Sequence, residues 1–384
     1  MVRILHVSDT HLGARQYGLD IREEDIYETF RQVIDIAINE RVDAVIHTGD
    51  LFDKNTPPVS AISLALRELK RLKEKGIPFI AIAGNHDAPK RSNEKLPQRI
   101  LEEEERLILL DLRKPQYKVA DIEIYGISYI PITAQKTLKE TLSKLKPSSK
   151  KSILMLHQAV SPFLPYQGIH YELEVSDLPK GFGIIALGHI HNRYKDVLDG
   201  GTIVEIPGSP DIIRADEIES YERTKKGVTL IDYSKQEPEI TYINTDVRPQ
   251  LKVTINTTKL EDDVKAIINS LLPLKSKKPI LHITLEGTPV KKSVIITKLK
   301  ELSKVAEYYR IAHDNTSYIT DSGQNVKTPT SSSLDEMIFT YLTKVANYSE
   351  SDAKLIISLL KEENEEEIEK ILIKFAGLDQ IDGN

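Results

Sequence analysis

The chain has 384 residues, 40% of them hydrophobic, and a formal net charge of -6. This length and apolar content suffice for a buried core and for two or three domains. The absence of cysteine excludes disulfides, zinc-thiolate sites and cysteine nucleophiles, so any bound metal must have nitrogen and oxygen ligands. The negative charge argues against a wholly basic nucleic-acid coat but leaves local basic patches open.

The sequence carries no sign of a membrane or export segment. No run of about 18 apolar residues occurs, which is the length that a membrane-spanning helix needs. Met1 leads directly into a strand-like run without a charged and apolar leader. We therefore expect an intracellular, cytoplasmic protein with no membrane partner.

Residues 1–245 alternate strand-like runs with helical stretches, such as 23–39 and 59–75. This alternation predicts an α/β domain built on a sheet. Five of the apolar runs are rich in Ile, Val and Leu and are typical of buried strands. These five runs span residues 2–7, 43–48, 78–83, 152–156 and 183–187.

Polar residues that can bind a metal follow each of these five strands. The clusters are Ser8-Asp9-Thr10-His11, Gly49-Asp50, Gly84-Asn85-His86-Asp87, His157 and Gly188-His189-Ile190-His191. Each cluster alone has an ordinary explanation, such as a turn or a core histidine. Their joint occurrence at strand ends, where open α/β sheets build active sites, predicts a metal site. The histidines that lack such company are predicted to be structural: His6, His47, His170, His282 and His313.

The next segment, 246–322, alternates strand, helix, strand, helix and strand, which predicts a small α+β module. Its residues 252–304 include eleven lysines against five acids. Such an excess can cover one side of a nucleic-acid duplex, and a solvated face explains it almost as well.

The last part of the chain, residues 323–384, is predicted to be a linker followed by helices. Residues 323–333 are polar, with Gly, Pro, Thr and Ser, and are predicted to be a linker. Residues 334–384 show apolar positions at helical spacing and predict three short amphipathic helices. These helices either dock on the body of the protein or bind a partner. The glutamates between 362 and 369 would repel DNA, so the expected partner is a protein.

The order of the five clusters, over residues 1–210, resembles the calcineurin-like metallophosphoesterase superfamily. Longer strings narrow the resemblance to the nuclease subunit of the DNA double-strand-break repair complex, the meiotic-recombination-eleven family, in its archaeal form. The resemblance implies an α/β fold: a layered metallophosphoesterase sheet sandwich flanked by helices, a small α+β capping domain and a C-terminal helical segment that binds an ATPase. The strings are 8–13, 47–53, 83–87 and Ile206-Pro207-Gly208-Ser209-Pro210.

The ligand set suits two-metal chemistry, in which paired cations bind the oxygens of a phosphodiester and lower the pKa of a water. Two like-charged cations lie close together only if they share a carboxylate ligand. Asp50 is the natural bridge, as the resemblance also implies. Ligands without sulfur suit two Mn²⁺ per subunit, with Fe²⁺ or Zn²⁺ as alternatives, and the resemblance favours Mn²⁺. One site is predicted to comprise Asp9, His11 and His191, and the other Asn85, His157 and His189.

His86 is predicted to be catalytic, because the resemblance places the corresponding histidine on the phosphate. We expect it to donate a hydrogen bond or proton to the scissile phosphate or the leaving oxygen, oriented by a carboxylate such as Asp87. The alternative is a histidine that merely packs in the turn. Asp53 departs from the family, because many members have a histidine there that is linked to exonuclease action. The balance of exonuclease and endonuclease activity is therefore left open.

The resemblance implies a Mn²⁺-dependent DNA nuclease, a duplex 3'-5' exonuclease and single-strand endonuclease that processes double-strand breaks. Its implied partners are DNA, a second copy in a homodimer and an SMC-like coiled-coil ATPase, which would place it at the nucleoid. Two alternatives stay open: a phosphodiesterase or phosphatase acting on small nucleotides or phosphoproteins, and a scaffold that has lost the reaction. No nucleic-acid-binding residue is assigned, since the basic residues near the clusters are as often solvated: Arg15, Lys54, Lys90, Arg91 and Arg193.

Overall fold

A computed structural model describes residues 2–89, 94–164, 171–235, 237–273, 277–316, 318–319, 325–326, 338–339, 341–343 and 348–359. The chain divides into two compact units, which are described separately. The first comprises residues 1–253, 270–282 and 303–310, and the second 254–269, 283–302 and 311–384. Among the described residues, no helix combines the length and apolar character needed to cross a membrane.

The first unit contains a six-stranded sheet in the order β14-β13-β1-β2-β3-β4. Strands β1 to β4 run parallel, whereas β13 and β14 are antiparallel additions at one edge. The strands are β1 (Arg3–Val7), β2 (Ala44–Thr48), β3 (Phe79–Ile82), β4 (Ile108–Leu109), β13 (Gly227–Asp232) and β14 (Glu239–Asn244).

A second six-stranded sheet has the order β11-β12-β10-β7-β6-β5. Its four central strands are parallel, and both edge strands are antiparallel. The strands are β5 (Gln116–Val119), β6 (Ile122–Ile127), β7 (Ser152–Leu156), β10 (Ile184–Leu187), β11 (Tyr194–Val197) and β12 (Ile203–Ile206). The five predicted strands coincide with β1, β2, β3, β7 and β10 to within one residue at each end.

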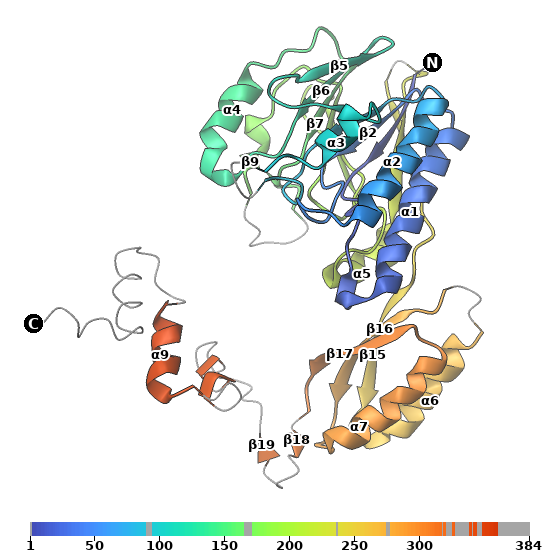
Figure 1. Cartoon of the computed structure of the whole chain (residues 1–384), viewed down its shortest axis with the longest axis vertical. Coiled ribbons are helices and arrows are strands. Elements are labelled where there is room, and N and C mark those ends of the chain that lie inside the picture. The colour runs from blue at the N-terminus through green and yellow to red at the C-terminus, as the bar shows by residue number, and fades with distance from the viewer. Residues whose placement is uncertain are drawn as a thin grey trace, which may run out of the picture. The chain divides into compact units, whose positions relative to one another are not determined.

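Alternating side chains of the strands pack in opposite directions and build a four-layer sandwich. In β1, Leu5 packs in a core shared with α1 (Asp20–Asn39) and α2 (Val59–Glu74). Its neighbour Ile4 packs in a core between the two sheets. A third core joins the outer face of the second sheet to α4 (Gln135–Ser143). The helices therefore flank a double sheet, as Figure 1 shows, and the predicted layered α/β sandwich is confirmed.

Shorter elements complete the first unit. They are α3 (Gln98–Glu103), α5 (Ile218–Thr224), the parallel pair β8 (Val160–Ser161) and β9 (Leu173–Glu174), and the 3₁₀ helices η1 (Gln16–Gly18), η2 (Ile132–Ala134), η3 (Val175–Asp177) and η4 (Ala215–Glu217). The helix α3 begins at Gln98, directly after Pro97.

A three-stranded sheet consists, in order, of β15 (Gln250–Asn256), β16 (Ile280–Glu286) and β17 (Tyr308–Asp314). Within the second unit, α6 (Leu260–Leu271) and α7 (Lys292–Leu299) contribute buried Val264, Ile295 and Leu299. Further elements described after β14 include η5 (Thr257–Lys259), η6 (Lys300–Lys304), β18 (Tyr318–Ile319), β19 (Asn325–Val326) and α9 (Glu350–Leu359).

The predicted domain boundaries, 1–245, 246–322, 323–333 and 334–384, stay a prediction. The strand β19 lies inside the expected linker and pairs with β18. The second expected C-terminal helix has apolar positions Leu355, Ile356, Leu359 and Leu360, of which α9 (Glu350–Leu359) includes the first three. The third, with Ile368, Ile371, Leu372 and Phe375, lies outside the described residues.

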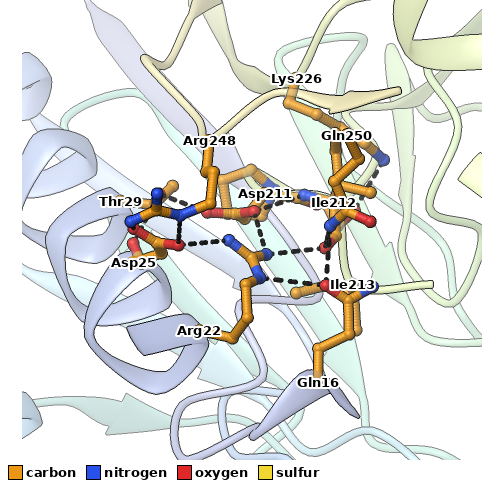
Figure 2. Close-up of polar contacts among 12 residues, drawn as sticks. Gln16, Arg22, Asp25, Thr29, Asp211, Ile212, Ile213, Lys226, Arg248 and Gln250 are labelled. Carbon is orange, nitrogen blue, oxygen red and sulfur yellow. Dashed lines mark hydrogen bonds and ion pairs between the residues drawn. The ribbon is translucent and has the colours of Figure 1, made fainter. Parts of the chain in front are cut away.

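A buried ion network joins α1 to two later segments of the first unit. Figure 2 shows the Arg22 guanidinium donating to Asp25 at 2.8 Å and to Asp211 at 2.7 Å. The Arg248 guanidinium donates to Asp25 at 2.6 Å, and Thr29 donates to Asp211 at 2.7 Å. Because all of these side chains are buried, each charge depends on its partners for solvation.

Replacement of Arg22 tests this dependence. Arg22→Met leaves the Asp211 carboxylate buried without its guanidinium, so we expect a loss of about 3 to 5 kcal/mol in the free energy of unfolding. Denaturant unfolding followed by circular dichroism measures it. The control is Arg31→Met, which breaks the solvent-screened pairs of Arg31 with Glu24 and Glu28 and costs about 1 kcal/mol or less. Equal losses in the two variants would contradict the network's role.

Candidate metal centre

The predicted ligands lie in tight turns at the carboxyl ends of strands from both sheets. Four of them have a positive backbone φ: Asp9 (54°), His11 (45°), Asp50 (54°) and His189 (76°). This left-handed region is uncommon for residues other than glycine, and such strain is concentrated at functional sites. The backbone is held there by bonds between turns, since Asp9 N donates to Gly49 O at 3.0 Å and His11 N donates to Asp50 O at 3.1 Å.

The first predicted ligand group converges in the structure. The Nε2 atoms of His11 and His191 lie 3.3 Å apart, and His191 Nε2 is 3.7 Å from Asp9 Oδ1. Nitrogen lone pairs and a carboxylate oxygen therefore face one small space, an arrangement that suits a divalent cation. Asp9 also accepts from His189 N at 3.1 Å, which fixes the carboxylate.

The second group converges beside the first. His157 Nε2 and His189 Nδ1 lie 2.9 Å and 3.0 Å from the same Asn85 Oδ1 atom. Asp50 Oδ2 lies 3.2 Å from His157 Nε2 and 3.8 Å from His11 Nε2, so one carboxylate oxygen faces both groups. The structure thus brings all seven predicted ligands close together, and Asp9, Asp50 and His157 form a further close group that draws on both predicted sets.

Glycine is required where Asp50 lies against the neighbouring turn. A Cβ atom at Gly84 would collide with the Asp50 carboxylate and with its backbone nitrogen. The bare backbone therefore lets the β2 and β3 turns approach each other. In this position Asp50 Oδ1 accepts from His86 N at 2.8 Å, which leaves Oδ2 for the ligand groups.

Burial makes the charges of the site interdependent. Although burial opposes the charged form, the Asp50 carboxylate raises the pKa of His157 to about 9, and His157 in turn holds the pKa of Asp50 well below its usual range. Burial and the charge of His157 lower the pKa of His189 to about 4. The Asp50 carboxylate thus faces imidazoles of contrasting basicity, and divalent cations would compensate its buried charge.

In two of the predicted ligands, the imidazole nitrogen that faces away from the site also makes a hydrogen bond. His157 Nδ1 donates to the Thr48 carbonyl at 2.7 Å, and His191 Nδ1 donates to Glu217 Oε1 at 2.7 Å. Such bonds fix the tautomer so that Nε2 carries the lone pair that faces the cation. Glu217 was missed by sequence reasoning, and its only sequence signal is its place shortly after the Gly208-Ser209-Pro210 string.

His86 is exposed at the edge of the site, next to His11, with 4.7 Å between ring centroids. Its Nδ1 donates to the Asp53 carbonyl at 2.8 Å. The prediction that Asp87 orients His86 is wrong, because the buried Asp87 carboxylate instead accepts from backbone amides. The donors are Gly84 N (2.9 Å), Phe52 N (3.0 Å) and Leu51 N (3.3 Å).

Asp53 faces the Nδ1 atom of His11, whereas His191 and Asp50 face its Nε2 atom. Its Oδ1 atom is 3.4 Å from His11 Nδ1, and the two form a further group with His86 that could hold a cation. Burial alone would raise the pKa of Asp53, but the nearby His11 lowers it overall. The residue that departs from the family pattern therefore contacts a predicted ligand.

The other candidate residues have structural partners. His6 pairs with buried Glu205, and His47 Nε2 lies 3.0 Å from Thr10 Oγ1, in agreement with their predicted structural roles. Arg193 donates to Asn244 and to two backbone carbonyls, and Arg15 pairs with Asp20. Lys54 is exposed, whereas Lys90 and Arg91 lie outside the described residues.

Comparisons with known proteins agree with this site. The family model described as calcineurin-like phosphoesterase matches residues 2–193, which include strands of both sheets and all the predicted ligands. The chain is thus a metal-dependent phosphodiesterase by class, and this family implies divalent metals at such a ligand set.

Curated relatives narrow the class. The chain is 51% identical over 382 residues to the DNA double-strand break repair protein Mre11 of Sulfolobus acidocaldarius, a match that covers 98% of this chain and 100% of the relative. It is 49% identical over 378 residues to that of Sulfurisphaera tokodaii (98% and 97%) and 46% identical over 382 residues to that of Saccharolobus solfataricus (98% and 100%). The chain belongs to the archaeal Mre11 family of calcineurin-like phosphoesterases.

Asp87 offers a test of how the turns are held. Asp87→Ala removes the acceptor of three buried amides at once, so we expect a loss of at least about 3 kcal/mol in the free energy of unfolding. Asp87→Asn keeps one acceptor oxygen and should lose less. Denaturant unfolding of the metal-free proteins measures both. An alanine variant as stable as the wild type would refute the proposed support of the Asp50 and Asn85 turns.

Proposed function

We propose that the protein is a Mn²⁺-dependent DNA nuclease, a duplex 3'-5' exonuclease and single-strand endonuclease that processes DNA ends in double-strand break repair. The observation that carries the proposal is the pair of ligand groups that share Asp50. Asp9, His11 and His191 would hold one cation and Asn85, His157 and His189 the other. Their nitrogen and oxygen donors, without sulfur, suit Mn²⁺, with Fe²⁺ or Zn²⁺ as less favoured ions.

Two cations bound here would neutralise phosphate charge and lower the pKa of a water that attacks the phosphodiester. Asp50 holds the two groups together, and the bonded imidazoles of His157 and His191 keep their lone pairs aimed at the cations. The cluster of buried, oriented donors is rigid before substrate arrives, which favours electrostatic stabilisation of the transition state.

His86 is the group that we assign to the substrate. Its Nδ1–H is committed to the Asp53 carbonyl, so its Nε2 atom is the one left to meet a phosphate. Nε2 can donate only when the ring carries both protons, and a neutral ring would accept there instead. The exposed position next to His11 suits a general acid that protonates the leaving oxygen.

The substrate and partners are proposed from the relatives and from charge. The named relatives act in DNA double-strand break repair. DNA ends and single strands are therefore the proposed substrates, and the excess of lysines in 252–304 would contact the duplex backbone. We also propose a homodimer at the nucleoid, with an SMC-like coiled-coil ATPase bound through residues 334–384.

Asp53 bears on the balance between exonuclease and endonuclease activity. An anionic carboxylate repels a phosphate, whereas a histidine at this position could present a cation to it. Because the Asp53 side chain faces His11, its effect would act on both the substrate and a ligand. The balance of exonuclease and endonuclease action is therefore the property that we expect Asp53 to affect.

The reaction is tested with end-labelled linear duplex and circular single-stranded DNA in Mn²⁺, beside a small phosphodiester. We expect the wild type to cleave DNA and His86→Ser to lose at least about 100-fold in rate, the usual contribution of a general acid. The variant should still bind Mn²⁺, because His86 belongs to neither proposed ligand group.

The matched control is His313→Ser, which removes an exposed histidine of β17 and should leave cleavage unchanged. Hydrolysis of the small diester alone would keep the metal site and refute the DNA substrate. An unchanged rate for His86→Ser would refute its role.

The C-terminal segment is tested by deletion of residues 334–384. We expect Mn²⁺-dependent cleavage to persist, because no proposed ligand lies there, and binding of the ATPase to be lost. Nuclease assays and co-purification with the ATPase measure the two properties, and circular dichroism checks folding. A folded truncation that cannot cleave DNA would contradict this division of roles.

A further inference from the structure

His191 is held from two directions by residues outside the predicted ligand set. Its Nδ1 atom donates to Glu217 at 2.7 Å, and its backbone carbonyl accepts from Lys226 Nζ at 2.8 Å. Lys226 also forms an ion pair with Glu217. Lys226, Glu217 and the predicted ligand His191 thus each contact the other two.

The Glu217 carboxylate has a full set of donors. Besides His191 and Lys226, it accepts from Ser209 Oγ at 3.0 Å and from Arg214 N at 2.8 Å. Glu217 and Lys226 are 3% and 2% exposed, so water does not solvate either charge. An isolated carboxylate would be costly here, and the ammonium group of Lys226 compensates it.

A buried pair of this kind adds little to stability when compared with apolar side chains of the same size. The geometry of the pair points instead to a role in orienting His191. A histidine that donates one ring N–H to a carboxylate is held in a single orientation and becomes a more basic metal ligand. The contact of Glu217 with His191 Nδ1 fits this arrangement, because His191 Nε2 faces Asp9 and His11.

We propose that Glu217 is a positioning residue for the metal centre, which acts through His191 and is paired with buried Lys226. This inference rests on the proposed metal site of Asp9, His11 and His191. It assigns Glu217 no contact with substrate. Its loss should weaken the cation on the His191 side more than the cation held by Asn85, His157 and His189.

A structural role for Glu217 has to be separated from this one, since its carboxylate also accepts from the backbone at the start of η4. The single variant Glu217→Gln leaves Lys226 buried without its counter-ion. The double variant Glu217→Gln with Lys226→Met removes both charges, and its glutamine can still bond to the backbone. If the pair served only stability, the double variant would bind metal as the wild type does.

A control comes from the ion network of Figure 2. Asp25 is a buried carboxylate whose partners include the guanidinium groups of Arg22 and Arg248, and its network reaches Glu217 through Asp211 and Ser209 rather than by direct contact. Asp25→Asn neutralises a buried acid of the same unit at similar burial. It should lower stability without changing metal affinity.

The experiment titrates metal-free full-length protein with Mn²⁺ and follows binding by calorimetry and electron paramagnetic resonance. We expect two ions per wild-type chain with the spectrum of a coupled pair. Both Glu217 variants should bind one ion about 10- to 100-fold more weakly and show the spectrum of an isolated ion at intermediate Mn²⁺. Asp25→Asn should behave as the wild type.

Two failures are distinguishable. A wild-type protein that binds no Mn²⁺ would refute the proposed metal centre itself. A wild type with two coupled ions, together with a folded double variant that binds both ions equally tightly, would keep that centre and overturn the role of Glu217.

Discussion

The position of the Asp50 carboxylate is the constraint on which the site depends. One of its oxygens accepts from the His86 amide, and the other faces imidazoles from both ligand groups. Two cations that share a carboxylate can lie close together only if that carboxylate does not move. The close approach of Gly84, which no side chain would permit, and the left-handed backbone of Asp50 both serve this placement.

The double sheet explains how such strained turns persist. β1, β2 and β3 deliver three turns from the first sheet, while β7 and β10 deliver two from the second, and a hydrophobic core lies between them. Buried acceptors then tie the turns to one another, as Asp87 does for the turns after β2 and β3. The free energy gained by burying the sheets offsets the backbone strain at their ends.

The sequence placed the candidate ligands at strand ends, where the structure has them, because strand ends are encoded locally. Apolar runs followed at once by Asp, Asn or His mark both the strand and its ligand, so Asp9, Asn85 and His157 could be placed from the sequence alone. Contacts between distant segments have no such signal. Asp87 follows His86 in the chain and suggested a contact between them, yet its carboxylate is directed at amides of another turn.

Glu217 shows why the outer part escaped prediction. It lies 26 residues from His191, in a 3₁₀ helix without a metal-ligand pattern, and only the fold brings the two together. Its charge also has to be reconciled with the reaction. Two dications at the proposed centre, with the carboxylates of Asp9 and Asp50, would leave about two positive charges to attract a phosphodiester. A third bare carboxylate would reduce that attraction, but the ammonium group of Lys226 would cancel it. Under the proposal, Glu217 would thus increase the basicity of His191 without weakening the field that draws in the substrate.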